Sequence, residues 1–232
     1  RLAAPAMEAV RALSAHPATQ RVSVAGSLRR HKETVHDIDI VCSCTDPPAL
    51  SKAFAELPQV EEVLARGDRK TTVGLAGGLQ ADLRLVDDEH FASILHHFTG
   101  SKDHNVQMRT RALARGLRLN EYGLVRSEDG ASIPCPTERD LFRALGLDEI
   151  QPELREGLGE IEAAEEGSLP DLVRLEDVRG MLHVHTDHSD GADSVSDMVA
   201  AVAQRGFSYV GISDHSKSAG YIYGLKEPDI TA

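Results

Sequence analysis

The sequence has no tryptophan, few other aromatic residues and three cysteines among its 232 residues. With aromatic residues at 4%, it has few rings on which successive bases could stack, which argues against a base-stacking platform as the main binding device. No run approaches the roughly 20 apolar residues that span a bilayer, so we expect no membrane partner. The first residues contain neither an initiating Met nor the apolar segment of a secretion signal, and we expect a chain cut from a longer protein.

The three cysteines, Cys42, Cys44 and Cys135, form no even framework and no C-x-x-C pair. This usage is typical of reduced thiols in a cytoplasmic protein. Cys42 and Cys44 are one residue apart at the end of an expected strand, where burial as small hydrophobic residues is favoured over metal binding.

The net charge of −12 is unevenly distributed along the chain. Residues 1–125 carry 16 Lys and Arg against 15 Asp and Glu, whereas residues 126–180 carry 6 against 15 and residues 181–232 carry 3 against 7. The acidity therefore lies outside the first segment, in which basic residues occur in clusters. Because clustered Lys and Arg are the electrostatic footprint of polyanion binding, the net charge does not exclude nucleic acid as a partner of this segment.

Hydrophobic spacing and turn residues predict an α+β fold with a mixed or antiparallel sheet. The expected strands are residues 21–27, 36–43, 60–66, 71–76 and 79–86, with a strand-rich patch at 117–126. The expected helices are residues 5–15, 49–57, 89–98, 101–115 and 138–145, and Ser101 and Thr137 are the expected N-caps of the last two. Residues 147–178 are acidic and predict a mostly irregular connection. A strand at 180–186, a helix at 194–205 and a strand at 207–213 then predict a β-α-β unit that opens a parallel-sheet domain.

Two acids, Asp37 and Asp39, stand on the expected strand 36–43. Alternate side chains of a strand share one face and are about 6.5–7 Å apart. Two carboxylates so placed can bracket two divalent ions about 3.5–4 Å apart, the arrangement used for in-line phosphoryl displacement. Ile38 and Ile40 then face a core. Taken alone, the D-x-D pattern favours an exposed strand with solvated acids.

Two neighbouring features change this interpretation. Gly26 and Ser27 form a turn expected to open a helix, and Arg30 follows, so free N–H groups, a hydroxyl and a guanidinium are available for a triphosphate. Asp82 lies on a later strand of the same sheet. Taken alone, the Gly-Ser turn equally suits an ordinary β-turn, and Asp82 favours a solvent-facing strand residue. Together with the D-x-D pair they indicate a nucleotidyltransferase palm.

Over about residues 5–145 the sequence resembles the family X DNA polymerases. The resemblance rests on GSLRR at 26–30, DID at 37–39, DLRLV at 82–86, HFTGS at 97–101 and LNEYG at 119–123. It implies that the catalytic carboxylates of Asp37, Asp39 and Asp82 hold two Mg²⁺ or Mn²⁺ ions. It further implies a nucleotide-binding set made of Gly26, Ser27, Arg30, His97, Phe98, Gly100, Asn105 and Arg109.

One residue departs from the family pattern. The family commonly has an aromatic residue before Phe-Thr-Gly-Ser, where the deoxyribose packs, and this chain has His97. The resemblance therefore does not imply that ribonucleotides are excluded. From the residues alone, His96 and His97 are expected to be half-buried histidines at a helix end rather than metal ligands.

A second group of candidate ligands lies in the β-α-β unit. His183 and His185 are two residues apart on the expected strand 180–186, Asp190 follows in the next loop, and His215 stands at the end of the next strand. Imidazole is a common ligand of zinc and manganese, and parallel sheets place their sites at strand ends. Together, the histidine pair, the loop aspartate and the later histidine resemble the first two motifs of the PHP phosphoesterases. That resemblance implies that these four residues bind Zn²⁺ or Mn²⁺ in the complete domain, and Asp214 is left as a weaker candidate.

The two resemblances predict four segments: a palm (1–90), a thumb (91–146), an acidic linker (147–178) and the N-terminal part of a PHP-type α/β barrel (179–232). We expect that the family's fingers and amino-terminal parts and the later PHP motifs are missing, so the PHP site is incomplete in this chain. The predicted function is a gap-filling, DNA-directed DNA polymerase that uses dNTPs and gapped or primer–template DNA, with a PHP phosphoesterase or 3′–5′ exonuclease region. A template-independent nucleotidyltransferase and a catalytically silent DNA-binding fragment remain the alternatives.

Overall fold

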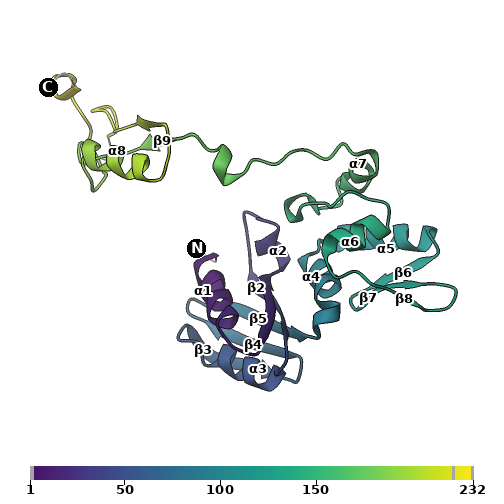
Figure 1. Ribbon diagram of the computed structural model, residues 1–232. Helices are drawn as coiled ribbons and strands as arrows, with labels where there is room; N and C mark the ends of the chain where they lie inside the picture. Colours follow the sequence, from purple (N-terminus) through teal and green to yellow (C-terminus); the bar gives the residue numbers. More distant parts are fainter. Residues whose placement is uncertain (1–2, 221–222, 231–232) are drawn as a thin grey trace. The chain divides into compact units, whose positions relative to one another are not determined.

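In the computed structural model, which describes residues 3–220 and 223–230, the chain divides into two units, Arg1–Leu169 and Pro170–Ala232 (Figure 1). The first unit opens with a five-stranded sheet of strand order β1-β2-β5-β4-β3. The strands are β1 (Thr19–Val24), β2 (Asp37–Cys44), β3 (Val60–Arg66), β4 (Lys70–Leu75) and β5 (Leu79–Val86). The pair β2–β5 is parallel and the other three pairs are antiparallel, so the expectation of a mixed sheet in an α+β fold is confirmed.

The core of this sheet follows from strand alternation. Ile38 and Ile40 of β2 are almost fully buried, as the spacing predicted, and Leu83 of β5 lies beside them in the same cluster. The helices α1 (Ala3–Ser14) and α3 (Pro47–Ala55) add their apolar side chains to this cluster. Helix α3 begins two residues before the predicted start because Asp46 caps it by accepting the N–H of Ala49.

A second cluster of buried side chains lies in the later part of the first unit. Its elements are α4 (Phe91–Thr99), α5 (Lys102–Ala114), β6 (Leu117–Asn120), β7 (Gly123–Arg126), β8 (Ser132–Ile133) and α6 (Glu138–Ala144), and the short helices α2 (Gly26–Arg29) and η1 (Asp88–His90) lie earlier in the chain. Met108, Leu124 and Phe142 are fully buried in this cluster. The expected N-caps are present: Ser101 caps α5, and Thr137 forms a capping box with Asp140 at α6.

The acidic segment 147–178 is mostly irregular, as expected, but its first half contains helical turns and packs on the second cluster. The turn η2 (Pro152–Leu154) and the helix α7 (Glu160–Glu166) belong to the first unit, and Ile150 and Ile161 are buried in the second cluster. Apolar residues spaced among the acids supply the buried face, which net charge alone conceals. In the later part, which contains the turn η3 (Leu175–Asp177), the side chains of Val173, Leu175 and Val178 are exposed, as is Leu158 in the first half.

The second unit contains β9 (Gly180–Val184), α8 (Val195–Gln204), β10 (Tyr209–Ile212) and the short helix α9 (Glu227–Ile230). Strands β9 and β10 pair in parallel, as the predicted β-α-β unit requires. Ser194 caps α8 by accepting the N–H of Asp197. Across both units, none of the helices described has the length and apolarity to cross a bilayer.

The three cysteines are free, as expected, and all are buried, whereas burial was predicted only for Cys42 and Cys44. Burial raises the pKa of the Cys42 thiol to about 11, which keeps it protonated at neutral pH. Burial likewise raises the pKa of the thiols of Cys44 and Cys135.

Candidate active site and candidate metal centre

Three carboxylates lie on the two central strands of the sheet. Asp37 and Asp39 stand on β2, and β5 runs parallel beside it in a register that makes Asp39 and Asp82 direct partners. Burial, and then the charges of Asp37 and Asp82, raise the pKa of Asp39 to about 6. The three acids are thus close enough to repel one another.

Asp82 is the most confined of these acids at 8% exposure. Its carboxylate accepts a hydrogen bond from Thr72 Oγ1 at 2.6 Å and lies 2.7 Å from Lys70 Nζ. The alternative of a solvent-facing strand residue is therefore wrong. Lys70 and Thr72 were missed by the sequence analysis. The three-residue loop 76–78 sets the register that places Thr72 opposite Asp82 in the β4–β5 hairpin, whereas counting outward from a two-residue Gly77-Gly78 turn places Val73 there.

The chemistry of these donors fits a divalent cation. Carboxylate oxygens are the preferred ligands of Mg²⁺ and Mn²⁺, and mutual repulsion among clustered carboxylates is relieved when a cation binds between them. Lys70 contacts Asp82, and its charge and that of Arg84 lower the pKa of Asp39, but burial and carboxylate repulsion still prevail at Asp39. The arrangement is suited to hold metal at Asp37, Asp39 and Asp82.

The turn before α2 approaches this cluster closely. Gly26 has a φ of +62°, and a Cβ built on it would lie 2.4 Å from Asp39 Oδ2. A residue with a side chain would meet both a left-handed backbone and a collision with the carboxylate. Glycine therefore lets the start of α2 lie against Asp39, an approach that the sequence analysis did not predict.

A pocket of 480 Å³ opens beside Asp37 and Asp39, and Asp82 is not part of its lining. It brings together residues of the palm motifs and of α4 and α5, which are about 70 positions apart in the sequence. All eight residues of the expected nucleotide-binding set line it: Gly26, Ser27, Arg30, His97, Phe98, Gly100, Asn105 and Arg109.

Several of these side chains are held by one another. Asn105 Nδ2 donates to the backbone oxygen of His97 at 2.8 Å, and Arg109 Nη2 lies 3.2 Å from His97 Nδ1. Burial lowers the pKa of His97 despite the nearby Glu121. His97 is half-buried as expected, whereas His96 is 2% exposed, so that expectation is wrong for His96. Its ring packs against Phe142 in the second cluster.

A buried ion cluster joins α2 to the later part of the first unit. Glu138 of α6 accepts from Arg29 Nη2 at 2.6 Å and from Arg155 Nη1 at 2.5 Å. Burial alone would raise the pKa of Glu138, but the two guanidinium groups outweigh it and hold that pKa at about 2. The sequence carried no signal for this cluster, because Arg29 and Glu138 are 109 positions apart.

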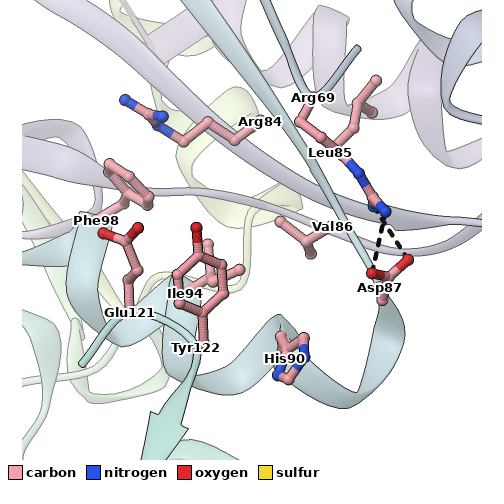
Figure 2. A pocket seen from close by; sticks show the side chains of 10 residues that line it. All are labelled: Arg69, Arg84, Leu85, Val86, Asp87, His90, Ile94, Phe98, Glu121 and Tyr122. Atoms are coloured by element: carbon pink, nitrogen blue, oxygen red, sulfur yellow. Dashed lines mark hydrogen bonds and ion pairs between the residues drawn. The ribbon is translucent and has the colours of Figure 1, made fainter. Parts of the chain in front are cut away.

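A second pocket, of 340 Å³, lies between β5, α4 and the β6–β7 turn (Figure 2). Figure 2 shows the ion pair of Arg69 and Asp87 at one end of this pocket, and the side chains of Phe98 and Glu121 near each other at the other end. The guanidinium of Arg84 lies 3.7 Å from the centre of the Phe98 ring. Phe98 lines both pockets, so it forms part of the wall between them.

In the second unit, His185, Asp190 and His215 form a candidate metal centre. One donor atom from each of these residues lies within 4.8 Å of the others. His185 Nδ1 and Asp190 Oδ1 are 2.7 Å apart, and the hydrogen bond from His185 lowers the pKa of Asp190. Two imidazoles and a carboxylate that converge in this way suit Zn²⁺ or Mn²⁺.

The fourth expected ligand, His183, is not a member of that group. It has a φ of +61°, β9 ends at Val184, and the ring of His183 stacks on that of His185 with centres 5.1 Å apart. The two histidines are therefore not a simple pair on one strand face. Asp214 accepts hydrogen bonds from Thr186 and Ser189, so it ties the loop that carries Asp190.

Comparisons with known proteins find family models that match part of each unit. The family model of the DNA polymerase beta thumb matches residues 94–156, and that of the PHP domain matches residues 181–227. The chain is 41% identical over 207 residues to the DNA polymerase/3'-5' exonuclease PolX of Bacillus subtilis, covering 88% of this chain and 36% of the relative. It is 30% identical over 159 residues to DNA polymerase lambda of Rattus norvegicus (56% and 28%), and 25% over 146 residues to repair DNA polymerase X of African swine fever virus (59% and 82%).

A carboxylate-bearing mixed sheet, a polymerase-beta-type thumb and a PHP region define the class: this is a family X DNA polymerase chain. Within that family it belongs to the bacterial PolX-like proteins, with a thumb and a partial PHP domain. The chain spans about a third of the length of the bacterial relative.

Proposed function

We propose that the first unit is the nucleotidyl-transferring part of a gap-filling DNA polymerase that acts on gapped or primer–template DNA with dNTPs. The observation that carries the proposal is the pairing of Asp39 with Asp82 across parallel strands, beside a pocket lined by the whole expected nucleotide-binding set. The palm comprises residues 1–90 and the thumb residues 91–146, with the segment to Leu169 packed on the thumb. In this proposal residues 179–232 belong to a PHP-type α/β barrel that follows the linker.

Different residues of the first unit have different roles in the proposed reaction. Asp37, Asp39 and Asp82 would hold two Mg²⁺ or Mn²⁺ ions, which would lower the pKa of the primer 3′-OH and offset charge on the leaving pyrophosphate. Ser27, Arg30 and the N–H groups at the start of α2 bind the triphosphate. Thr72 and Lys70 orient the Asp82 carboxylate by the contacts described above. Asn105 and Arg109 lie on the nucleotide side of α5, where they contact the nascent base pair.

The second unit supports a further part of the proposal. His185, Asp190 and His215 converge as a metal-binding group, and His183 lies against His185. With Zn²⁺ or Mn²⁺ bound by residues of the whole PHP domain, such a centre would serve a phosphoesterase or 3′–5′ exonuclease reaction. The family model and the bacterial relative support this assignment.

Primer extension on one-nucleotide-gapped DNA tests the polymerase proposal. Asp82→Asn keeps the shape of the side chain but removes one carboxylate, and we expect incorporation to fall by on the order of 10³-fold or more because metal-held charge is lost. Asp68→Asn, at an exposed acid on the β3–β4 turn, is the matched control and should leave incorporation unchanged. Ordinary incorporation by Asp82→Asn would refute the palm assignment. Equal incorporation without a template strand would favour a template-independent transferase, and gapped-DNA binding without incorporation by the unaltered protein would favour a silent DNA-binding module.

A further inference from the structure

The segment that follows α6 contacts residues that line the 480 Å³ pocket. The backbone oxygen of Arg155 accepts the N–H of Ser101 at 2.8 Å, and its side chain is 1% exposed in the ion cluster with Glu138. Both contacts anchor the backbone on the residue before Glu156. Although the sequence places Glu156 in an acidic connection, the structure holds it beside α2.

Glu156 contacts two basic residues of the GSLRR region. Its Oε1 accepts a hydrogen bond from Arg30 Nε at 2.8 Å and lies 3.5 Å from Lys32 Nζ. A second nitrogen of Arg30, Nη1, donates to the backbone oxygen of Thr99. The side chains of Arg30 and Glu156 are 13% and 22% exposed, so water screens this ion pair only in part.

These contacts leave part of the guanidinium for a ligand. Nε is directed to Glu156 and Nη1 to Thr99, while Nη2 makes no hydrogen bond with any residue in the described ranges. Arg30 also lines the 480 Å³ pocket. A guanidinium that is already oriented loses less side-chain entropy when it binds a phosphate oxygen than a free one does.

We propose that Glu156 is a positioning residue for nucleotide binding: it orients Arg30 so that Nη2 donates to a phosphate oxygen of the incoming dNTP. The inference rests on the proposed function, because it assumes that the pocket takes a triphosphate. It adds a residue outside the palm and thumb motifs to the nucleotide site.

A competing role of Glu156, in which it blocks Arg30, would have a different effect on nucleotide binding. If the Glu156 carboxylate instead competed with the phosphate for the Arg30 guanidinium, removing the carboxylate would free the guanidinium and tighten nucleotide binding. The carboxylate engages the inner Nε, however, and not the Nη1–Nη2 end of the fork. The geometry therefore favours orientation over competition.

The experiment measures equilibrium binding of dATP with Mn²⁺, and the KM for dATP on gapped DNA, for a set of variants. We expect Glu156→Ala to weaken binding and raise KM roughly tenfold, the effect of losing one charge-assisted contact. Glu156→Gln retains an oxygen that accepts from Nε and should stay within about threefold of the unaltered protein. Glu153→Ala is the matched control, because Glu153 lies on the same segment and its nearest basic contact is His31 at 3.9 Å.

Arg30→Ala separates this inference from the proposed function. If Glu156 acts through Arg30, adding Glu156→Ala to Arg30→Ala causes no further loss. Arg30→Ala that binds dATP normally would remove Arg30 from the nucleotide site and refute both proposals at this residue. Weak binding by Arg30→Ala together with normal or tighter binding by Glu156→Ala would overturn only the positioning role. A Gln variant as weak as the Ala variant, or a loss that adds fully to that of Arg30→Ala, would also overturn it.

Discussion

The buried carboxylate of Glu138 makes a sharp prediction about stability. Glu138 is 8% exposed and Arg155 is 1% exposed, so Glu138→Gln leaves a buried guanidinium without its counter-charge while hardly changing the packing. The pKa of Glu138 lies at about 2 in the folded chain against 4.5 for an ordinary Glu. That difference corresponds to about 3 kcal/mol of stability at pH 7. Breaking a buried ion pair by removing one partner typically costs about 3–5 kcal/mol, which agrees in size.

The pH dependence follows from the sign of this pKa difference. A carboxyl group whose pKa is lowered by folding stabilises the fold fully above its unfolded pKa of 4.5 and loses that contribution as the pH falls towards 2. The free energy of unfolding of Glu138→Gln should therefore be about 3 kcal/mol below that of the unaltered protein at pH 7. The gap between the two should shrink to less than half by pH 3.

Urea denaturation followed by circular dichroism at pH 7 and pH 3 measures both quantities. Glu165→Gln is the matched control: Glu165 also pairs with two arginines, Arg111 and Arg115, but its side chain is 51% exposed. Its urea midpoint should hardly move, because exposed ion pairs are screened by water. A Glu138→Gln variant as stable as the control at pH 7, or a gap that is the same at both pH values, would contradict this reasoning.

Two further substitutions test the two candidate metal sites. Gly26→Ala should weaken Mn²⁺ binding and nucleotide incorporation by roughly tenfold or more, because its Cβ would displace Asp39 Oδ2 and a displaced ligand loses metal affinity. Gly77→Ala is the control for backbone strain, because Gly77 has a similar φ of +81° and a Cβ there would have nothing within 4 Å. This control should leave Mn²⁺ binding and incorporation unchanged. His185→Ala should lower Zn²⁺ affinity, measured by titration against a chelating dye, by on the order of 10- to 100-fold, whereas His188→Ala should not. Equal effects of Gly26→Ala and Gly77→Ala, or of the two histidine variants, would show that the assigned carboxylate or ligand contacts are not responsible.

Much of the first unit was predictable from short-range pattern. Strand alternation placed Asp37 and Asp39 together and turned Ile38 into the core, and the structure confirms the burial of Ile38. Ser101 and Thr137 marked the starts of α5 and α6. These features can be predicted because strand period and helix capping depend on residues two to four positions apart, which a short stretch of sequence contains.

The second unit was predictable in its elements but not in the detail of its site. The β-α-β unit appears at the expected strands and helix, with β9 and β10 parallel. The left-handed backbone at His183 departs from the extended strand on which the i, i+2 argument relied. A single backbone angle of this kind is set by the packing of the loop around it, and residue identity does not encode it.

The sequence by itself determined which carboxylates and basic residues the chain carries and which of them share a strand face or a turn. The tertiary structure alone decided that Asp82 lies opposite Asp39, because that register comes from parallel pairing of β2 with β5 across a helix and two other strands. It also decided that Glu138 and Glu156 reach the arginines of the GSLRR turn. Those contacts join residues more than 100 positions apart, and they form only when two apolar clusters pack and bring α2 and α6 into one unit.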